Sequence, residues 1–569
     1  MRLLLSRWEL HRERNIVVSI LIAGLLNGLL FTFLMPPWQH YDEPSHFEYA
    51  WLFANRDRSP EIGEYDQAMR REVAASMVEH NFFASLGARP NLLSQTEPVW
   101  IGISQTNDPP LYYWLVSLPL RLVRTSDITF QLYLARLISV CLYLVTILGS
   151  YLMVRELTKP ASVLHWLIPT TMIMLPGFSD LMTSVNNDVG AVAVFSIFLW
   201  LCSRAIRRSK DWLSLVGITA TAVLCFLTKN TVMIAIPLAL IAGLFAVFRD
   251  RQRVVAWSVL GLVALAMLIF TLRWDGAIAW YQQEVGGTFI HQNESEENLL
   301  GERCLRFAVP QSSQIRVLQP LSIDQVVGLR GEIVTVGAWI WATDSMQAST
   351  PILSDGVNEY FEPIEISSIP TYFSFQVLIP KNAERLMVVL DPPSLPQSGE
   401  IYFDNVVMLK GDHTATTSDT VGGTSGDGGL QISNLVENSS FEEAWLVVTP
   451  EIERHLVSWL PFEPSHVFSS LSKWDSAGWY YRATIENLFR TFWAKFGWGH
   501  ISMAGQKPYR VLFMATLLGG IGAAVAFWRL KRELPLEMWA FLGIAIMVVW
   551  VAAILRGVVS LSGEIFIHG

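Results

Sequence analysis

The sequence is poor in charged residues and in cysteine. Charged side chains make up 16% of its 569 residues, whereas soluble globular proteins carry about 25%. The four cysteines form no readable disulfide framework and no C-x-x-C metal site. Acidic residues outnumber basic ones, and the formal net charge of −9 argues against a nucleic-acid partner.

Several catalytic motifs are also missing. The chain contains no P-loop, no G-x-S-x-G and no H-E-x-x-H, so ATP-driven transport, α/β-hydrolase chemistry and zincin chemistry lack support. The apolar run after the basic N-terminus is too long for a signal peptide, and no clean cleavage site follows it. We therefore expect an uncleaved first span.

Long apolar runs dominate what is present. Hydrophobic residues reach 51%, with a mean hydropathy of +0.35. The run Ile16–Met35 carries no charge and is long enough to cross a bilayer. The run Leu111–Val123 is short and contains Pro119, which favours an interfacial or re-entrant helix. Further runs bring the expected total to about nine spans; they lie at about 132–154, 163–178, 189–203, 212–227, 231–248, 254–272, 511–528 and 538–555.

The basic residues predict an orientation. They concentrate in the N-terminal tail and in alternate connections between spans, whereas the short connections on the other side hold only Lys229 and Arg556. Under the positive-inside rule the N-terminus is cytoplasmic, and residues 36–130 and 273–510 face outward. The prediction is a multi-pass membrane protein with a cytoplasmic N-terminus, and the family resemblance given below implies a bacterial plasma (inner) membrane.

A region of different character lies between the spans. Short alternating stretches such as "EIVTVGAWIWA" and "EIYFDNVVMLKGD", separated by turn residues, predict a β-sandwich over residues 290–445. They resemble the jelly-roll carbohydrate-binding modules. That resemblance makes Asp404 a candidate ligand for structural calcium, with a plain turn residue as the alternative. We expect Trp339, Trp341, Tyr360 and Tyr372 to belong to the core rather than to a sugar platform.

The end of this region is irregular in composition. Residues 414–429 read as a flexible Gly/Ser/Thr linker. "NLVENSSFEEAW" follows and resembles an opening strand of the same modules, so it either completes the sandwich out of order or begins a second copy. The aromatic, amphipathic stretch 478–500 predicts a helix in the membrane interface. The expected domains are therefore 1–275, 290–445 and 446–569.

The stretch "HYDEPSHFEYAW" directly after the first span holds two adjacent carboxylates. Asp42 and Glu43 before Pro44 are typical of a helix start. Their place at the membrane edge among aromatic residues also favours a general base, because partial burial raises a carboxylate pKa.

This arrangement resembles the GT-C glycosyltransferases, which have one span followed by a D-E pair opening a long outer loop. "NDPPLYYWLVSLPLRLV" and "LPGFSDLMTSVNNDVGAVAVF" resemble segments of a bacterial branch known mostly as predicted membrane proteins. The likeness covers residues 10–275 well and 478–560 loosely. It implies a multi-pass α-helical fold with the sandwich inserted. Members commonly have more spans, so we expect that the chain is truncated or lacks the last helices.

The resemblance implies transfer of a sugar from a polyprenyl-phosphate donor to a glycan, lipid or protein acceptor on the outer face, with inversion. Asp42 would be the base, and Glu43 would orient it, position the acceptor or bind Mg²⁺ or Mn²⁺. We assign no cofactor with certainty; a divalent cation, Mg²⁺ or Mn²⁺, at the active site and Ca²⁺ in the sandwich stay open. Lys229 and Arg136 are candidates for the leaving phosphate, with headgroup contact as the alternative. The remaining candidates for substrate binding are His46, Asn107, Asp108, Asn187 and Asp188, the last also serving the start of a span.

Two other functions stay open. A glycolipid transporter or flippase would place charged or helix-breaking residues near mid-membrane, and a polysaccharide polymerase would share the lipid substrate. The spans are nearly uncharged at mid-depth and the polar residues gather at the outer rim, which favours an enzyme.

Overall fold

The structure is a computed structural model of the chain. It describes residues 2–56, 58–85, 90–92, 98–160, 162–208, 211–247, 253–282, 288–292, 301–308, 316–391, 400–413, 433–457, 464–472, 474–499, 501–530 and 535–555. The expected linker 414–429 lies outside these residues. The chain divides into two compact units, Met1–Leu260 with Glu486–Val549, and Gly261–Ile485 with Trp550–Gly569.

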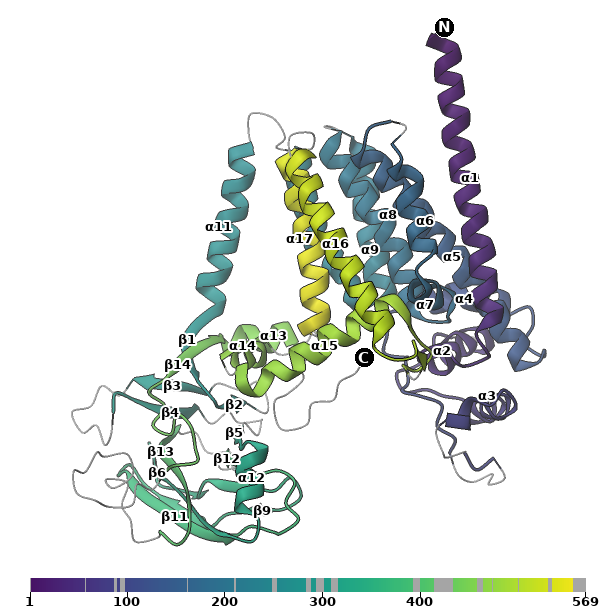
Figure 1. Cartoon of the computed structure of the whole chain (residues 1–569). Coiled ribbons are helices and arrows are strands. Elements are labelled where there is room, and N and C mark those ends of the chain that lie inside the picture. The colour runs from purple at the N-terminus through teal and green to yellow at the C-terminus, as the bar shows by residue number, and fades with distance from the viewer. Residues whose placement is uncertain are drawn as a thin grey trace. The chain divides into compact units, whose positions relative to one another are not determined.

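The first unit is α-helical (Figure 1). Most of its long helices follow the apolar runs of the sequence, which are bounded by charged or capping residues, whereas α1 also includes the charged tail before its run. Asp127, for example, begins α5 by accepting hydrogen bonds from the backbone N–H groups of Thr129 and Phe130. The helices of this unit that match expected spans are α1 (Arg2–Leu34), α5 (Ile128–Leu157), α8 (Asn187–Arg207), α9 (Trp212–Thr228), α10 (Ala235–Val247) with the preceding turn η2 (Asn230–Ile234), and α16 (Lys507–Leu530).

One expected span is broken. The run 163–178 forms two short helices, α6 (Leu164–Ile173) and α7 (Pro176–Thr183). The break has a local cause, because Pro176 lacks an N–H and disfavours helical geometry at the preceding Leu175. Leu175 is accordingly extended, with ψ of 108°.

Shorter helices surround one end of the long ones. Figure 1 shows α2 (Glu43–Asn55), α4 (Leu111–Leu120) and α7 near the same end of α5 and α8. The short α4 matches the helix expected at 111–123 in position and length, and its interfacial or re-entrant placement stays a prediction. Nearby in the chain are α3 (Gln67–Glu79) and the turn η1 (Phe82–Ser85).

Within the described residues, five helices are long and apolar enough to cross a membrane. They contain Arg12–Leu34, Ile128–Leu157, Asn187–Arg207, Asn230–Val247 and Lys507–Val525. Shorter apolar stretches lie in α4, α9, α11 (Arg253–Thr271) and α17 (Leu536–Leu555). The chain is thus a membrane protein with several apolar helices, and the total of nine spans stays a prediction.

The second unit contains a β-sandwich of two five-stranded antiparallel sheets. The strand orders are β11-β6-β13-β4-β3 and β2-β5-β12-β8-β9. The strands are β2 (Tyr281–Gln282), β3 (Thr288–Gln292), β4 (Arg303–Ala308), β5 (Val317–Pro320), β6 (Ile333–Ala342), β8 (Ile352–Ser354), β9 (Glu359–Tyr360), β11 (Thr371–Leu378), β12 (Met387–Leu390) and β13 (Glu400–Lys410). This confirms a separate β region and extends it slightly before the expected start at 290.

The remaining elements lie between the sandwich strands or after them in the chain. β7 (Met346–Ser349) pairs with β10 (Pro363–Ile366), α12 (Ile323–Leu329) follows β5, and α13 (Pro450–Val457), α14 (Pro464–Ser472) and α15 (Trp474–Ala494) come after the last strand. α15 agrees with the helix expected over 478–500 and continues into the hairpin β15 (Lys495–Phe496) and β16 (Ile501–Ser502) of the first unit.

The segment "NLVENSSFEEAW" completes the same domain and does not begin a second copy. Asn434 binds the backbone of Val406 and Met408 on β13, and Phe441 is fully buried in the sandwich core. Beyond it, β14 (Ala444–Val448) pairs with β1 (Leu272–Ala277), which directly follows α11.

Candidate functional site

Glu43 and Arg136 form a completely buried ion pair. Arg136 Nε and Nη2 donate to the two oxygens of Glu43 at 2.8 and 2.6 Å, and both side chains are 0% exposed. The other guanidinium N–H groups donate to the carbonyl oxygens of Thr32, Met35 and Pro36 at 2.8–3.1 Å. Arg136 on α5 therefore closes the end of α1, where backbone carbonyls lack helical partners, and ties it to the start of α2.

This geometry corrects two expectations. All five N–H groups of Arg136 are engaged, so it has no donor left for a leaving phosphate. Glu43 also accepts from the backbone N–H of Val185 at 3.3 Å. Burial alone would raise the pKa of Glu43, but the charge of Arg136 outweighs it and holds the pKa below 4.5. Glu43 is a fixed structural carboxylate whose oxygens are occupied, and it does not fit an Mg²⁺ or Mn²⁺ site.

Asp42 stands at the N-cap position of α2, as the helix-start interpretation predicts. Its backbone is left-handed, with φ of +53°, and its side chain makes no capping hydrogen bond to α2. The residue is half-buried. A non-glycine residue in this conformation is uncommon and costs of order 1–3 kcal/mol, so the surrounding structure has to hold it there. The next residue, Glu43, is fixed by its ion pair with Arg136.

A polar network connects α2, α4 and α8 one turn beyond Asp42. His46 Nδ1 lies 2.8 Å from the hydroxyl of Tyr113, which donates to Asp108 Oδ2 at 3.3 Å. Asn187 Nδ2 donates to the same oxygen at 2.8 Å. Because the Tyr113 hydroxyl donates to Asp108, His46 has to donate from Nδ1 to the Tyr113 oxygen, which leaves Nε2 as an acceptor. The backbone of His46 is itself bonded to the carbonyl of Asp42 at 3.2 Å.

The electrostatics of the network favour a neutral histidine. Burial lowers the pKa of His46, and the positive charge of Lys229 lowers it further, to about 3. Burial and the Asp108 carboxylate raise the pKa of Tyr113 well above 10. Asn187 is fully buried, and its Oδ1 has no hydrogen-bond partner within the described residues. A buried acceptor of this kind normally binds water or a ligand.

Lys229 and Asp188 form an ion pair beside this network. Lys229 Nζ lies 2.7 Å from Asp188 Oδ2, and the side chains are 13% and 39% exposed. Lys229 follows the last residue of α9, and Asp188 lies in the first turn of α8, whose N-cap is Asn186. The helix-start interpretation of this stretch is therefore confirmed, and the two charges pair with each other at this end of the helices.

Close helix packing sets these positions. The side of Gly190 on α8 lies against Tyr112 of α4 and Thr228 of α9, where an added Cβ would approach both to 3.0 Å. The absence of a side chain lets the three elements meet, which brings Asn187 and Lys229 to the same end of the bundle.

The sequence did not identify every residue of the site. Tyr113 bridges His46 and Asp108. In the sequence it is marked only as one of two adjacent tyrosines in the short helix α4, which does not indicate a functional residue. His40 Nδ1 lies 2.9 Å from Asp180 Oδ1, with both residues buried; their separation in sequence left no signal. Asn107, in contrast, is exposed and does not belong to the network within the described residues.

The outer face of the sheet β11-β6-β13-β4-β3 carries a second cluster, the aromatic face. Trp339 lies opposite Tyr372 in register, with ring centroids 5.8 Å apart. Trp341 stacks on Tyr402 at 5.4 Å with an interplanar angle of 7°. All four rings are half-buried. The expectation that Trp339, Trp341 and Tyr372 belong to the core is wrong, because the alternating residues of β6 place Val334, Val336, Ala338, Ile340 and Ala342 inward. Tyr360 does pack against the core.

Asp404 lies on β13 and is 4% exposed, and burial raises its pKa to about 7. Its role as a ligand for structural calcium stays a prediction. No group of three or more His, Cys, Asp or Glu in the described part of the chain is arranged to hold a metal ion.

A family model described as predicted membrane protein (DUF2142) matches residues 25–310 of the 569. The chain belongs to the DUF2142 family. No curated protein matches this DUF2142 chain.

Solved structures similar to part of the DUF2142 chain include carbohydrate-binding modules. A CBM4 module is 14% identical over 23% of this chain and 86% of its own, with a TM-score of 0.18. TmCBM61 in complex with β-1,4-galactotriose is 14% identical over 24% and 92%, at 0.20. The CBM22-1 xylan-binding domain of Paenibacillus barcinonensis Xyn10C is 10% identical over 24% and 92%, at 0.19. TM-scores of this size establish neither a shared fold nor a shared ligand.

Proposed function

We propose that this protein is a bacterial inner-membrane glycosyltransferase that transfers a sugar from a polyprenyl-phosphate donor to an acceptor at the outer membrane face. One observation carries the proposal. Asp42, the His46–Tyr113–Asp108–Asn187 network and the Asp188–Lys229 pair converge at one end of the apolar helices. Such a rim offers a proton acceptor, hydrogen-bonding groups and a cation where a lipid-linked phosphate would lie.

The proposed reaction assigns one role to each group. Asp42 accepts the proton of the acceptor hydroxyl while the hydroxyl oxygen attacks the anomeric carbon of the donor sugar. The bond between that carbon and the phosphate oxygen breaks. The configuration inverts, and the electron pair leaves on the polyprenyl phosphate. Lys229 stabilises the developing phosphate charge, sharing its ammonium with Asp188. Asn187 Oδ1 and His46 Nε2 accept hydrogen bonds from sugar hydroxyls.

The test replaces the base without changing its shape. Asp42→Asn removes proton acceptance and should lower sugar transfer by roughly 10²–10⁴-fold, with normal expression and donor binding. Asp127→Asn is the matched control, because Asp127 is an N-cap at which asparagine serves equally well. Transfer is measured with a defined polyprenyl-phosphate sugar in nanodiscs.

Near-normal transfer by Asp42→Asn would remove Asp42 as the base. A flippase would be favoured if no transfer product formed and the lipid-linked sugar crossed the bilayer at the same rate in wild type and in Asp42→Asn. A product series that lengthens by repeat units would favour a polymerase.

We further propose that the aromatic face binds carbohydrate weakly and holds an acceptor glycan. The stacked Trp341–Tyr402 pair and the Trp339–Tyr372 pair offer flat apolar surfaces, and Glu400 beside Tyr402 offers a polar edge. Trp341→Ala should weaken binding of a responsive glycan by at least about five-fold. Phe361→Ala is the control, because Phe361 is a 48% exposed aromatic residue of the same domain outside this face. Equal losses of glycan binding in the two variants would indicate that the sandwich serves only as a spacer domain.

A further inference from the structure

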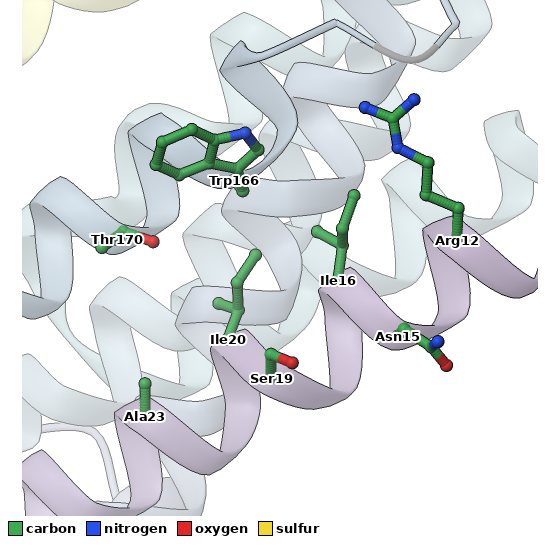
Figure 2. A pocket seen from close by; sticks show the side chains of 8 residues that line it. All are labelled: Arg12, Asn15, Ile16, Ser19, Ile20, Ala23, Trp166 and Thr170. Carbon is green, nitrogen blue, oxygen red and sulfur yellow. The ribbon is translucent and has the colours of Figure 1, made fainter.

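A groove lies between α1 and α6, remote from the candidate site. Its volume is about 630 Å³, within the range of small-molecule sites. Figure 2 shows Arg12, Ile16 and Ile20 extending from α1 towards the side on which Trp166 of α6 lies. Thr170 faces α1 one turn beyond Trp166.

The groove has a polar end and an apolar end. Arg12 and Asn15 lie at one end, and Ile16, Ile20 and Ala23 continue along α1. The apolar helix segment Arg12–Leu34 has 23 residues, which rise roughly 34 Å at 1.5 Å per residue. The hydrocarbon core of a bilayer is about 30 Å thick. With Leu34 at the rim that carries Asp42, Arg12 therefore reaches the headgroup level of the opposite leaflet.

The polar end is held in place by a network between three helices. Glu13, the neighbour of Arg12, accepts a hydrogen bond from Tyr151 of α5 and lies 3.1 Å from Nδ1 of His165 on α6. His165 Nε2 is 2.9 Å from the hydroxyl of Thr158. Since His165 and Tyr151 are buried, these contacts fix α1 against α6 and define the groove walls.

We propose that this groove binds one anionic glycerophospholipid of the leaflet opposite the candidate site. The guanidinium of Arg12 pairs with the lipid phosphate. The amide of Asn15 and the hydroxyls of Ser19 and Thr170 serve the glycerol ester region, and one acyl chain follows Ile16, Ile20 and Ala23. Trp166, 42% exposed, lies at the depth where indole rings prefer the interface.

The opposite-leaflet position separates this site from the proposed donor site. A donor whose phosphate meets Lys229 places its headgroup at the other end of the helices. Charge complementarity selects the occupant, because a phosphate-free diacylglycerol offers Arg12 nothing, and phosphatidylcholine offsets its phosphate with a choline cation.

The test titrates the full-length protein in detergent with phosphatidylglycerol, phosphatidylcholine or diacylglycerol and counts bound lipids by native mass spectrometry. Arg12→Gln should weaken phosphatidylglycerol binding about five-fold, the effect of one cation near a membrane surface, and leave diacylglycerol binding unchanged. Arg14→Gln is the matched control, because Arg14 is an exposed arginine on the same helix that does not line the groove. It should leave phosphatidylglycerol binding unchanged.

A second variant tests the apolar part. Ile16→Trp fills the groove and should lower binding of all three lipids without changing charge. Equal effects of Arg12→Gln and Arg14→Gln would overturn the site in favour of general surface charge. Lipid binding that ignores Ile16→Trp would overturn the groove as the place where the acyl chain lies. Inorganic phosphate that competes as well as phosphatidylglycerol would overturn the lipid assignment.

Discussion

Glu43→Gln tests whether the buried pair is structural. The substitution keeps the size of the side chain and removes its charge, which leaves the Arg136 guanidinium 0% exposed without a counter-ion. Breaking a buried pair from one side costs about 3–5 kcal/mol of unfolding free energy. Arg136→Met should cost more, because it leaves both the Glu43 charge and the carbonyls of Thr32, Met35 and Pro36 without their donor.

Unfolding in detergent, followed by circular dichroism of the purified variants, measures the effect. The control is Glu61→Gln, which breaks the exposed Arg58–Glu61 pair whose side chains are 55% and 76% exposed; exposed pairs contribute at most about 1 kcal/mol. Because the folded-state pKa of Glu43 is lowered from 4.5, its contribution is present above that pH and is lost as pH falls below it. The difference between wild type and Glu43→Gln should therefore be constant from pH 8 to 6 and shrink in acid.

A loss no larger than that of Glu61→Gln, with a large loss of transfer activity, would refute this reasoning. It would return Glu43 to the chemistry, in the role of orienting the base or the acceptor. A large loss of stability instead assigns the effect of Glu43 on activity to the fold.

Three further predictions follow from the site and the orientation. His46 is held neutral with a folded-state pKa of about 3 against 6.5 unfolded, so wild-type stability should fall as pH drops below 6.5, by up to about 1.4 kcal/mol per pH unit, and His46→Gln should remove that slope. Lys229→Ala should weaken binding of the polyprenyl-phosphate donor while Lys229→Arg retains part of it; unchanged affinity in the alanine variant would reassign Lys229 to pairing with Asp188 and lipid headgroups. In a Cys141→Ser background, cysteines at the exposed positions Ile62 and Ile369 should react with an impermeant maleimide in cells with a permeable outer envelope. Val163→Cys should react only after lysis, and the opposite pattern would invert the predicted orientation.

Helix positions in the first unit could be predicted from hydropathy, because an uncharged run bounded by caps has few alternatives to a helix. The break between α6 and α7 could also have been predicted from the Leu175–Pro176 step, but the apolar run hid it. On β6 the period of two in "IVTVGAWIWA" was sufficient to place Trp339 and Trp341 on the face opposite Val334 and Val336. The hydrophobicity of Trp339 and Trp341, taken without this alternation, favours the core.

The ion pair between residues far apart in the chain could not be predicted from the sequence. The partners Glu43 and Arg136 lie on different helices, and each one read alone favoured chemistry at the rim. A charged residue in an apolar helix indicates a function or a buried partner, and only the fold decides between these. The cluster of His46, Asp108 and Asn187 was predicted as a set of candidates, whereas Tyr113, which joins them, carries no charge and was overlooked.

The two adjacent carboxylates have different tasks, and the backbone between them explains why they are neighbours. Arg136 directs its five N–H donors to Glu43 and to carbonyl oxygens at the end of α1, so Glu43 is held firmly in place. Asp42 has φ of +53°, and its side chain makes no hydrogen bond that caps α2. An aspartate that only started the helix would gain from a cap bond and would not need a strained backbone. The strained backbone of Asp42 is thus consistent with the function proposed for this residue, and it lies next to a residue fixed by a buried ion pair.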